Sequence, residues 1–174
     1  MNAYEVEQSL QSLTLIIDTR EQITGRLDVR IQSAELPYER KKLDFGDYSA
    51  RCDVLDLSDK VVIERKMNLD ELAMCFGSQR KRFEREFERA KKVNAKVYLL
   101  IENANLDTLY NEDSYRMRCK SKFTRKAMLA SIFAFLARYN ITVLFCHEDN
   151  TGKVIREILY REMKERLSDL QWDG

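Results

Sequence analysis

The sequence predicts an α/β domain in which a central mixed β-sheet is flanked by helices. Short strand-like runs rich in branched residues lie close together in the first 66 residues, where short loops favour antiparallel pairing. Two apolar runs at 96–102 and 141–146 then alternate with helical segments, as in parallel sheets. Antiparallel strands followed by strands that alternate with helices indicate one mixed sheet covered by helices.

The first half of the chain is expected to contain most of the strands. Residues 1–12 are polar and predict a loosely ordered lead-in to a single domain, 13–174. A short helix within Glu21–Glu35 should end before Pro37. The short connections favour an antiparallel meander of the later strands. The predicted strands are Thr14–Asp18, Tyr38–Leu43, Asp47–Cys52 and Lys60–Lys66.

The second half is expected to alternate helices with strands. Asn68 is a suitable N-cap, with Glu71 at capping-box spacing, and begins a helical segment that Gly77 interrupts. Ser78 can cap the second part of that segment. The inward stripe comprises Leu69, Leu72, Phe76, Phe83 and Phe87. The predicted elements are helix Asn68–Val93, buried strand Lys96–Glu102, helix Lys122–Tyr139, buried strand Ile141–Cys146 and helix Thr151–Leu170.

Composition excludes several classes of protein. Hydrophobic residues make up 44% of the 174 residues, with one proline, which excludes disordered and collagen-like chains. The formal net charge of +1 means that any nucleic-acid binding must come from local patches. The four cysteines show no C-x-x-C spacing, which favours free thiols in a reducing compartment. No signal peptide or membrane-spanning run is visible, so we expect a soluble, intracellular (cytoplasmic) protein.

The segment KVVIERKMNLD (60–70) carries the strongest chemical signal. Residues i and i+2 of a strand share a face, so Glu64 and Lys66 should project together while Arg65 points the other way. A carboxylate can hold a hard metal ion, and a nearby positive charge assists attack by water on phosphorus. Further acids are available upstream at Asp18 and Asp47. Alone, the Glu64 and Lys66 pair would fit an edge-strand salt bridge, and Asp47 would fit a turn after Gly46.

The strings IDTRE, GDY and IERKxxxD occur together, the last as Glu64-Arg65-Lys66-Met67-Asn68-Leu69-Asp70. This set resembles the XPF family of structure-specific endonucleases, a branch of the PD-(D/E)xK superfamily with a restriction-endonuclease-like core. The resemblance covers roughly residues 13–147. We expect a stand-alone form, because neither the tandem helix-hairpin-helix motifs nor the helicase domain of many family members is recognisable in the sequence.

The resemblance and the residue chemistry together assign candidate roles. Asp47 and Glu64 are the expected ligands of Mg²⁺, for which Mn²⁺ is expected to substitute. Lys66 would position or deprotonate the attacking water, or stabilise the phosphorane; its choice between base and electrostatic role stays open. The resemblance implies that Asp18 borders the metal site as a further catalytic residue. It also implies a 5′-phosphate and a 3′-hydroxyl as products.

Five further residues are predicted to support the site. By resemblance Arg20 and Glu21 support it or hold the scissile phosphate; alternatively they begin a solvated helix. Arg65 should pack against or pair with another element. Asp70, through the family motif, would act behind Lys66 or Arg65. Arg80 interrupts the inward stripe and needs an anionic partner, namely the active-site acids or a phosphate, unless the Gly77 break turns it into solvent.

DNA contact is predicted for the segment YRMRCKSKFTRK (115–126), which has six basic residues and no acid. These residues are Arg116, Arg118, Lys120, Lys122, Arg125 and Lys126. The helix Lys122–Tyr139 is apolar on most sides, so one face must be covered by the last helix or by a second subunit. Because members of the resembled family pair through helices of this region, a homodimer formed within 122–170 is one of these alternatives.

The sequence therefore predicts a Mg²⁺-dependent DNA endonuclease that acts on branched, flapped or junction DNA in repair, recombination or phage-type processing. Two alternatives stay open: a non-catalytic DNA-binding or interaction module with the same fold, and a restriction-type enzyme that cuts duplex DNA. We expect neither a membrane segment nor a nucleotide cofactor.

Overall fold

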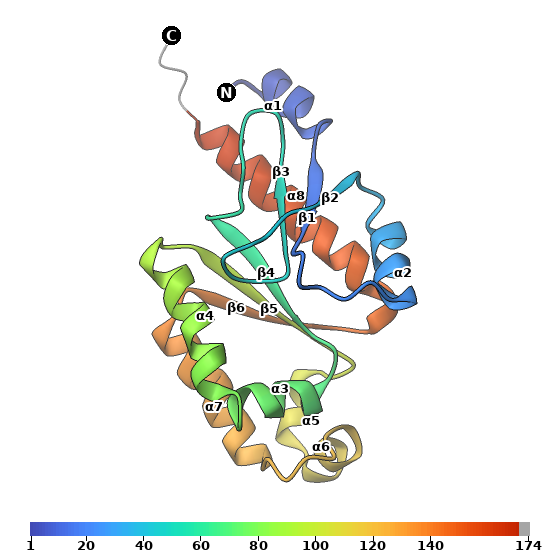
Figure 1. Ribbon diagram of the computed structural model, residues 1–174, viewed down its shortest axis with the longest axis vertical. Helices are drawn as coiled ribbons and strands as arrows, with labels where there is room; N and C mark the ends of the chain where they lie inside the picture. Colours follow the sequence, from blue (N-terminus) through green and yellow to red (C-terminus); the bar gives the residue numbers. More distant parts are fainter. Residues whose placement is uncertain (171–174) are drawn as a thin grey trace.

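The computed structural model describes residues 1–170 as a six-stranded mixed sheet covered by helices on both faces (Figure 1). The last four residues of the predicted domain 13–174 lie outside the described part. The strands are β1 (Thr14–Ile17), β2 (Tyr38–Arg40), β3 (Tyr48–Arg51), β4 (Val61–Lys66), β5 (Lys96–Glu102) and β6 (Ile141–Cys146). The α/β prediction with a mixed central sheet is confirmed.

The helices occupy two layers. They are α1 (Ala3–Leu10), α2 (Gly25–Ala34), α3 (Leu69–Phe76), α4 (Arg80–Lys92), α5 (Leu106–Tyr110), α6 (Glu112–Arg118), α7 (Arg125–Arg138), the 3₁₀ helix η1 (Glu148–Asn150) and α8 (Thr151–Asp169). One face of the sheet carries α3 to α7, and the other carries α1, α2 and α8 (Figure 1). No helix among residues 1–170 is long and apolar enough to cross a membrane.

The strand order is β2-β1-β3-β4-β5-β6. β3 pairs antiparallel with β1 and β4, whereas β4, β5 and β6 are parallel to one another. The predicted meander is wrong for β2, which pairs in parallel with β1 at the outer edge, with Leu15 opposite Tyr38. Helix α2 makes this arrangement possible, because a helical crossover returns the chain to the same end of the sheet.

The first layer has an aromatic core. The predicted stripe of α3 and α4 is buried, and the break at Gly77 is confirmed. Phe76, Phe83 and Phe87 contact Phe135 of α7, with ring centroids 5.0, 5.5 and 5.1 Å away. The predicted cap by Ser78 is wrong, because Gln79 is the N-cap of α4 and makes no side-chain cap.

The second layer corrects three expectations. Residues 1–12 contain α1, which Asn2 and Glu5 cap and which buries Val6 and Leu10 beside α8. Helix α8 buries its stripe in its own chain, on the face opposite α7, so it does not cover α7. β6 is an edge strand that is mostly half-buried, because an apolar run alone does not distinguish an edge from an interior position.

Candidate active site

The C-terminal half of β4 places Glu64 and Lys66 on one face, as predicted. Only 5% of Glu64 and 7% of Lys66 is exposed. The Lys66 Nζ lies 2.5 Å from the Glu64 Oε1, 3.8 Å from Glu71 and 5.1 Å above the Phe83 ring. Arg65 points to the opposite face, where it forms ion pairs with Glu21 and Glu102. Its predicted pairing with another element is therefore observed.

A glycine turn brings Asp47 beside this pair. Gly46 has a φ of +74°, and a Cβ there would lie 2.7 Å from the Cβ of Val62, so the turn requires glycine. The Asp47 amide donates to the Ile63 carbonyl at 2.8 Å. The Asp47 carboxylate accepts the Arg65 amide at 2.8 Å and remains half-buried. Asp47 therefore joins Glu64 and Lys66 at one end of β4, and it is the most exposed of the three. The sequence predicts all three to be catalytic, and we call them the catalytic trio.

The two acids of the catalytic trio hold protons more tightly than ordinary carboxyls. Burial and the nearby Glu64 carboxylate raise the pKa of Asp47 to about 8. Burial also raises the pKa of Glu64, against the opposing effect of Lys66. Burial alone would lower the pKa of Lys66, but the carboxylates of Glu64 and Asp47 outweigh it and raise the pKa. The raised pKa keeps Lys66 in its charged form beside the two acids.

Asp18 borders the trio as a support. Its side chain is 1% exposed, and its Oδ1 accepts the Arg20 amide and Nε at 2.7 and 2.8 Å. Its Oδ2 accepts the Leu43 amide at 2.7 Å, and its own amide donates to the Asp47 carbonyl at 2.8 Å. Burial opposes ionisation, but the bonds to Arg20 and Leu43 prevail and lower the pKa of Asp18. With both oxygens occupied, Asp18 fixes the loop that carries Asp47, and its predicted direct catalytic role has no geometric support.

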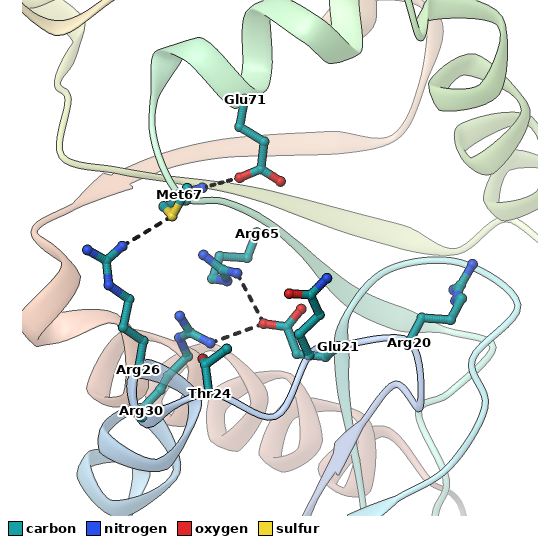
Figure 2. A pocket seen from close by; sticks show the side chains of 10 residues that line it. Arg20, Glu21, Thr24, Arg26, Arg30, Arg65, Met67 and Glu71 are labelled. Carbon is teal, nitrogen blue, oxygen red and sulfur yellow. Dashed lines mark hydrogen bonds and ion pairs between the residues drawn. The ribbon is translucent and has the colours of Figure 1, made fainter.

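A cleft of about 830 Å³ opens beside the trio, between the β1–α2 connection and the β4–α3 connection. Figure 2 shows eight of its residues labelled. Its lining comprises Arg20, Glu21, Gln22, Thr24, Gly25, Arg26, Arg30, Arg65, Met67 and Glu71. The trio does not line this cleft, but Glu71 does and lies 3.8 Å from Lys66.

Glu21 is the centre of a buried network on the inner wall of the cleft. Its Oε1 accepts from Tyr48, Arg30 and Arg65 at 2.9, 3.1 and 3.1 Å (Figure 2 shows the two arginines). The Nη2 of Arg20 also reaches the Leu43 carbonyl at 3.1 Å. The alternative that Arg20 and Glu21 begin a solvated helix is therefore wrong, because both lie before α2 and are tied to the protein.

Two predicted support residues lie elsewhere. Asp70 accepts the amides of Lys120 and Ser121, each at 2.8 Å, and so fixes the loop after α6, with no bond to Lys66 or Arg65. Arg80 pairs with Glu84 at 2.9 Å and is 35% exposed, away from the acids of the trio. The predicted bond of Asp70 to Lys66 or Arg65 is wrong, because a motif does not reveal which distant segment supplies the partner. The predicted pairing of Arg80 with the active-site acids is also wrong, because Glu84 of the same helix is its partner.

The basic segment is partly neutralised by an acid just outside it. Glu112 pairs with Arg116 at 3.0 Å and with Arg125 at 2.9 Å. Arg118, Lys120, Lys122 and Lys126 are exposed, and none of them forms an ion pair with a carboxylate in the part of the chain that the structure describes. DNA contact through these four residues stays a prediction.

Two acids near the trio were not predicted as site residues. The sequence predicts Glu71 only as a capping residue, although it also accepts the Met67 amide at 2.7 Å near Lys66. Glu86 lies on α4 next to Phe87, lines a small cavity with Glu64, and contributes to the raised pKa of Glu64. The sequence signal that could have identified Glu86 is its position next to Phe87, a residue of the predicted inward stripe.

The trio suits a metal ion held through few protein ligands. Among residues 1–170 there is no group of three or more His, Cys, Asp or Glu arranged for a metal. Mg²⁺ is commonly held by one or two carboxylates and keeps several waters. Asp47 and Glu64 supply two such carboxylates, and each has a raised pKa that a cation would relieve. The residues present therefore fit a magnesium ion.

Comparisons with known proteins give a family match for the domain and similar folds. Residues 17–158 match the family model described as ERCC4 domain. The fold resembles XPF from Aeropyrum pernix, with 18% identity and a TM-score of 0.60, over 92% of this chain and 64% of that one. XPF from Aeropyrum pernix in a complex with DNA matches at 20% identity and a TM-score of 0.61, over 90% of this chain and 68% of that one. No curated protein sequence matches.

Proposed function

The chain belongs to the ERCC4 domain family, and on that premise we propose that it is a Mg²⁺-dependent endonuclease that hydrolyses phosphodiester bonds in DNA. The observation that carries the proposal is the meeting of Asp47, Glu64 and Lys66 at one end of β4. Two acids with raised pKa beside one buried ammonium match the needs of phosphodiester hydrolysis.

Each member of the trio has a distinct task in this proposal. Asp47 and Glu64 would hold the metal, which when bound neutralises phosphate charge and lowers the pKa of a water. Lys66 stays charged and stabilises the negative charge that develops on the phosphate oxygens. Asp18 and Gly46 hold Asp47 in place, so the carboxylate needs little reorganisation before reaction.

We further propose branched, flapped or junction DNA as the substrate class, with a 5′-phosphate and a 3′-hydroxyl as products. This part rests on the family resemblance of the motifs around Asp18, Asp47 and Glu64. The chain spans 64% of the length of the first similar structure. The substrate of the whole protein is therefore also a proposal.

We also propose that the domain works as a homodimer formed through α7. The stripe of α8 is buried in its own chain, so it offers no free surface. Helix α7 exposes Phe133 to 50% and Leu136 to 37%, on the side away from its own core. Two domains would place two basic surfaces on two arms of a branched substrate.

One observation favours a second candidate, a non-catalytic DNA-binding module. Glu64 is 5% exposed, and the trio does not line the large cleft. A domain that binds DNA without cleaving it could use the cleft and leave the trio closed.

The deciding experiment incubates the protein with labelled flap, fork, four-way junction and linear duplex DNA, in Mg²⁺ or EDTA. We expect cleavage only with the metal, and loss of more than about a hundredfold in Glu64→Gln, because the metal loses a ligand. Glu162→Gln is the matched control, since Glu162 forms a partly buried pair with Lys96 at 2.6 Å on the opposite layer. Equal cleavage by Glu64→Gln contradicts the assignment, and DNA binding without cleavage by the wild type supports the second candidate.

A further inference from the structure

One arginine of the cleft differs from the other three. The three that are held by carboxylates of the protein at 3.1 Å or closer are Arg20, Arg30 and Arg65. Arg26, the second residue of α2, is 64% exposed. Its Nη1 lies 3.1 Å from the Met67 Sδ and 3.7 Å from the Glu148 carboxylate (Figure 2 shows the contact with Met67). A thioether is a weak acceptor, so the guanidinium keeps most of its capacity to donate.

A second guanidinium approaches the same place from α6. The Nη1 of Arg118 donates to the Asn103 carbonyl at 2.8 Å, and Arg118 forms no ion pair within residues 1–170. Asn103 follows β5 with a φ of 61°. Its side-chain Nδ2 lies 3.4 Å from the Met67 carbonyl oxygen and 3.4 Å from the Glu148 carboxylate. Arg26 and Arg118 therefore both contact the cluster formed by Met67, Asn103 and Glu148.

This place adjoins the catalytic trio along the chain and in space. Met67 follows Lys66 directly and lines the same cleft as Glu71, which lies 3.8 Å from Lys66. The first turn of α2 begins at the same rim after the N-cap Thr24, whose side chain accepts the Leu27 amide at 3.3 Å. Arg116, the other arginine of α6, offers less because it shares Glu112 with Arg125 of α7.

We propose that Arg26 and Arg118 form a second phosphate-binding site, which grips the backbone of the DNA strand beside the phosphate held at the catalytic trio. The proposal rests on the proposed function only in taking DNA as the ligand. Two guanidinium groups that contact one cluster can both donate hydrogen bonds to phosphate oxygens of the backbone. Arginine suits this role better than lysine, because its planar fork of donors matches the geometry of a phosphate. Such contacts position the strand without reading its sequence.

A substitution of Glu148 should change DNA affinity in the direction opposite to substitutions of Arg26 and Arg118. Its carboxylate is 38% exposed and lies 3.7 Å from Arg26, where it competes with a phosphate for the guanidinium. The variant Glu148→Gln removes this charge, so Arg26 loses its competing carboxylate. The glutamine oxygen can still accept a hydrogen bond from the Asn103 side-chain amide. DNA affinity should therefore rise in this variant, whereas damage to the fold would lower it.

The experiment measures the dissociation constant of a fluorescent fork DNA by anisotropy in EDTA, at several salt concentrations. Arg26→Gln and Arg118→Gln should each weaken binding several-fold and reduce the salt slope by about 1. Glu148→Gln should tighten binding several-fold. Arg161→Gln on α8 is the matched control, because Arg161 is 66% exposed and lies 3.9 Å from its partner Glu157.

The outcomes separate this inference from the proposed function. If Arg26→Gln and Arg118→Gln bind DNA with the affinity and salt slope of Arg161→Gln, the second site does not exist, whether or not the wild type cleaves. If both weaken binding while the wild type cleaves no DNA in Mg²⁺, the second site stands and the endonuclease proposal fails. A weaker complex with Glu148→Gln would also count against the site, provided that the variant melts at the wild-type temperature.

Discussion

At the scale of single residues, Asp47 shows the cost of burying a carboxyl beside another acid. Its pKa is raised to about 8 by burial and by the nearby Glu64 carboxylate. In the unfolded chain the same group ionises with the ordinary aspartate pKa of about 3.8. Because the folded pKa lies above the unfolded one, the favourable contribution to stability is full below pH 4 and is lost as the pH rises to about 8.

This loss of stability with rising pH leads to a prediction for the metal-free protein. Asp47→Asn removes the ionisable group and keeps an oxygen that can accept the Arg65 amide. In EDTA the variant should melt several degrees above the wild type at pH 8, and the difference should disappear below pH 4. Differential scanning calorimetry across this range measures it. An equal difference at every pH would show that the charge of Asp47 does not cause the effect.

The same reasoning explains what the sequence predicted at this scale. The i, i+2 rule placed Glu64 and Lys66 together correctly, because strand geometry fixes which side chains share a face. It also placed Arg65 on the opposite face, where Glu21 and Glu102 hold it. The partners of Asp70 come from a segment about fifty residues away, which no local rule reveals. Arg80 instead pairs with Glu84 one turn along its own helix, a spacing that the i,i+4 rule favours.

At the scale of elements, one close contact fixes α2 against α8. A Cβ at Gly152 would lie 2.2 Å from the Arg30 carbonyl oxygen and 2.1 Å from the Ser33 Oγ. The two helices therefore meet at a point where only glycine fits. Arg30 belongs to the wall of the cleft, so this contact also holds one side of the cleft in place.

Gly152→Ala should therefore be strongly destabilising, by about 3 kcal/mol or more, because the clash involves backbone that has no room to move. Gly25→Ala is the matched control: Gly25 begins α2, and nothing lies within 4 Å of its added Cβ. This control should leave stability unchanged or raise it by about 0.5 kcal/mol. Urea denaturation of both variants distinguishes them, and similar midpoints would contradict the close contact.

Elements were predicted more reliably than their pairing. The runs that became β1, β4 and β5 are strongly apolar and branched, so composition alone identified them. The parallel pairing of β2 with β1 depends on how α2 packs, which involves residues far apart in the chain. The short helices α5 and α6 were not predicted, because seven residues or fewer give too little periodicity.

At the scale of the whole molecule, the sheet separates two cores with different exposure. The α8 core is closed by α1 and α2, whereas α7 forms an outer wall with exposed apolar side chains. The edge strand β6 is half-buried next to it. The apolar excess of the α7 segment was visible in the sequence, but the position of α8 on the other face was not.

The proposed homodimer gives the last prediction. Phe133 is 50% exposed on α7, so Phe133→Glu should leave the fold intact and place a charge in the interface. Light scattering at micromolar concentration should give twice the chain mass of 20.6 kDa for the wild type and the single mass for the variant. Val54→Glu is the control, because Val54 is 47% exposed in the connection between β3 and β4.

A wild type that scatters as a single chain would reject the dimer outright. Ile132→Glu is the control for loss of the fold. Ile132 is 4% exposed in the first core, so this substitution should unfold the domain. If Phe133→Glu is folded and monomeric while Val54→Glu remains dimeric, the contact lies on α7. The monomer should then bind forked DNA more weakly than the dimer, because it loses the second basic surface that acts at high effective concentration.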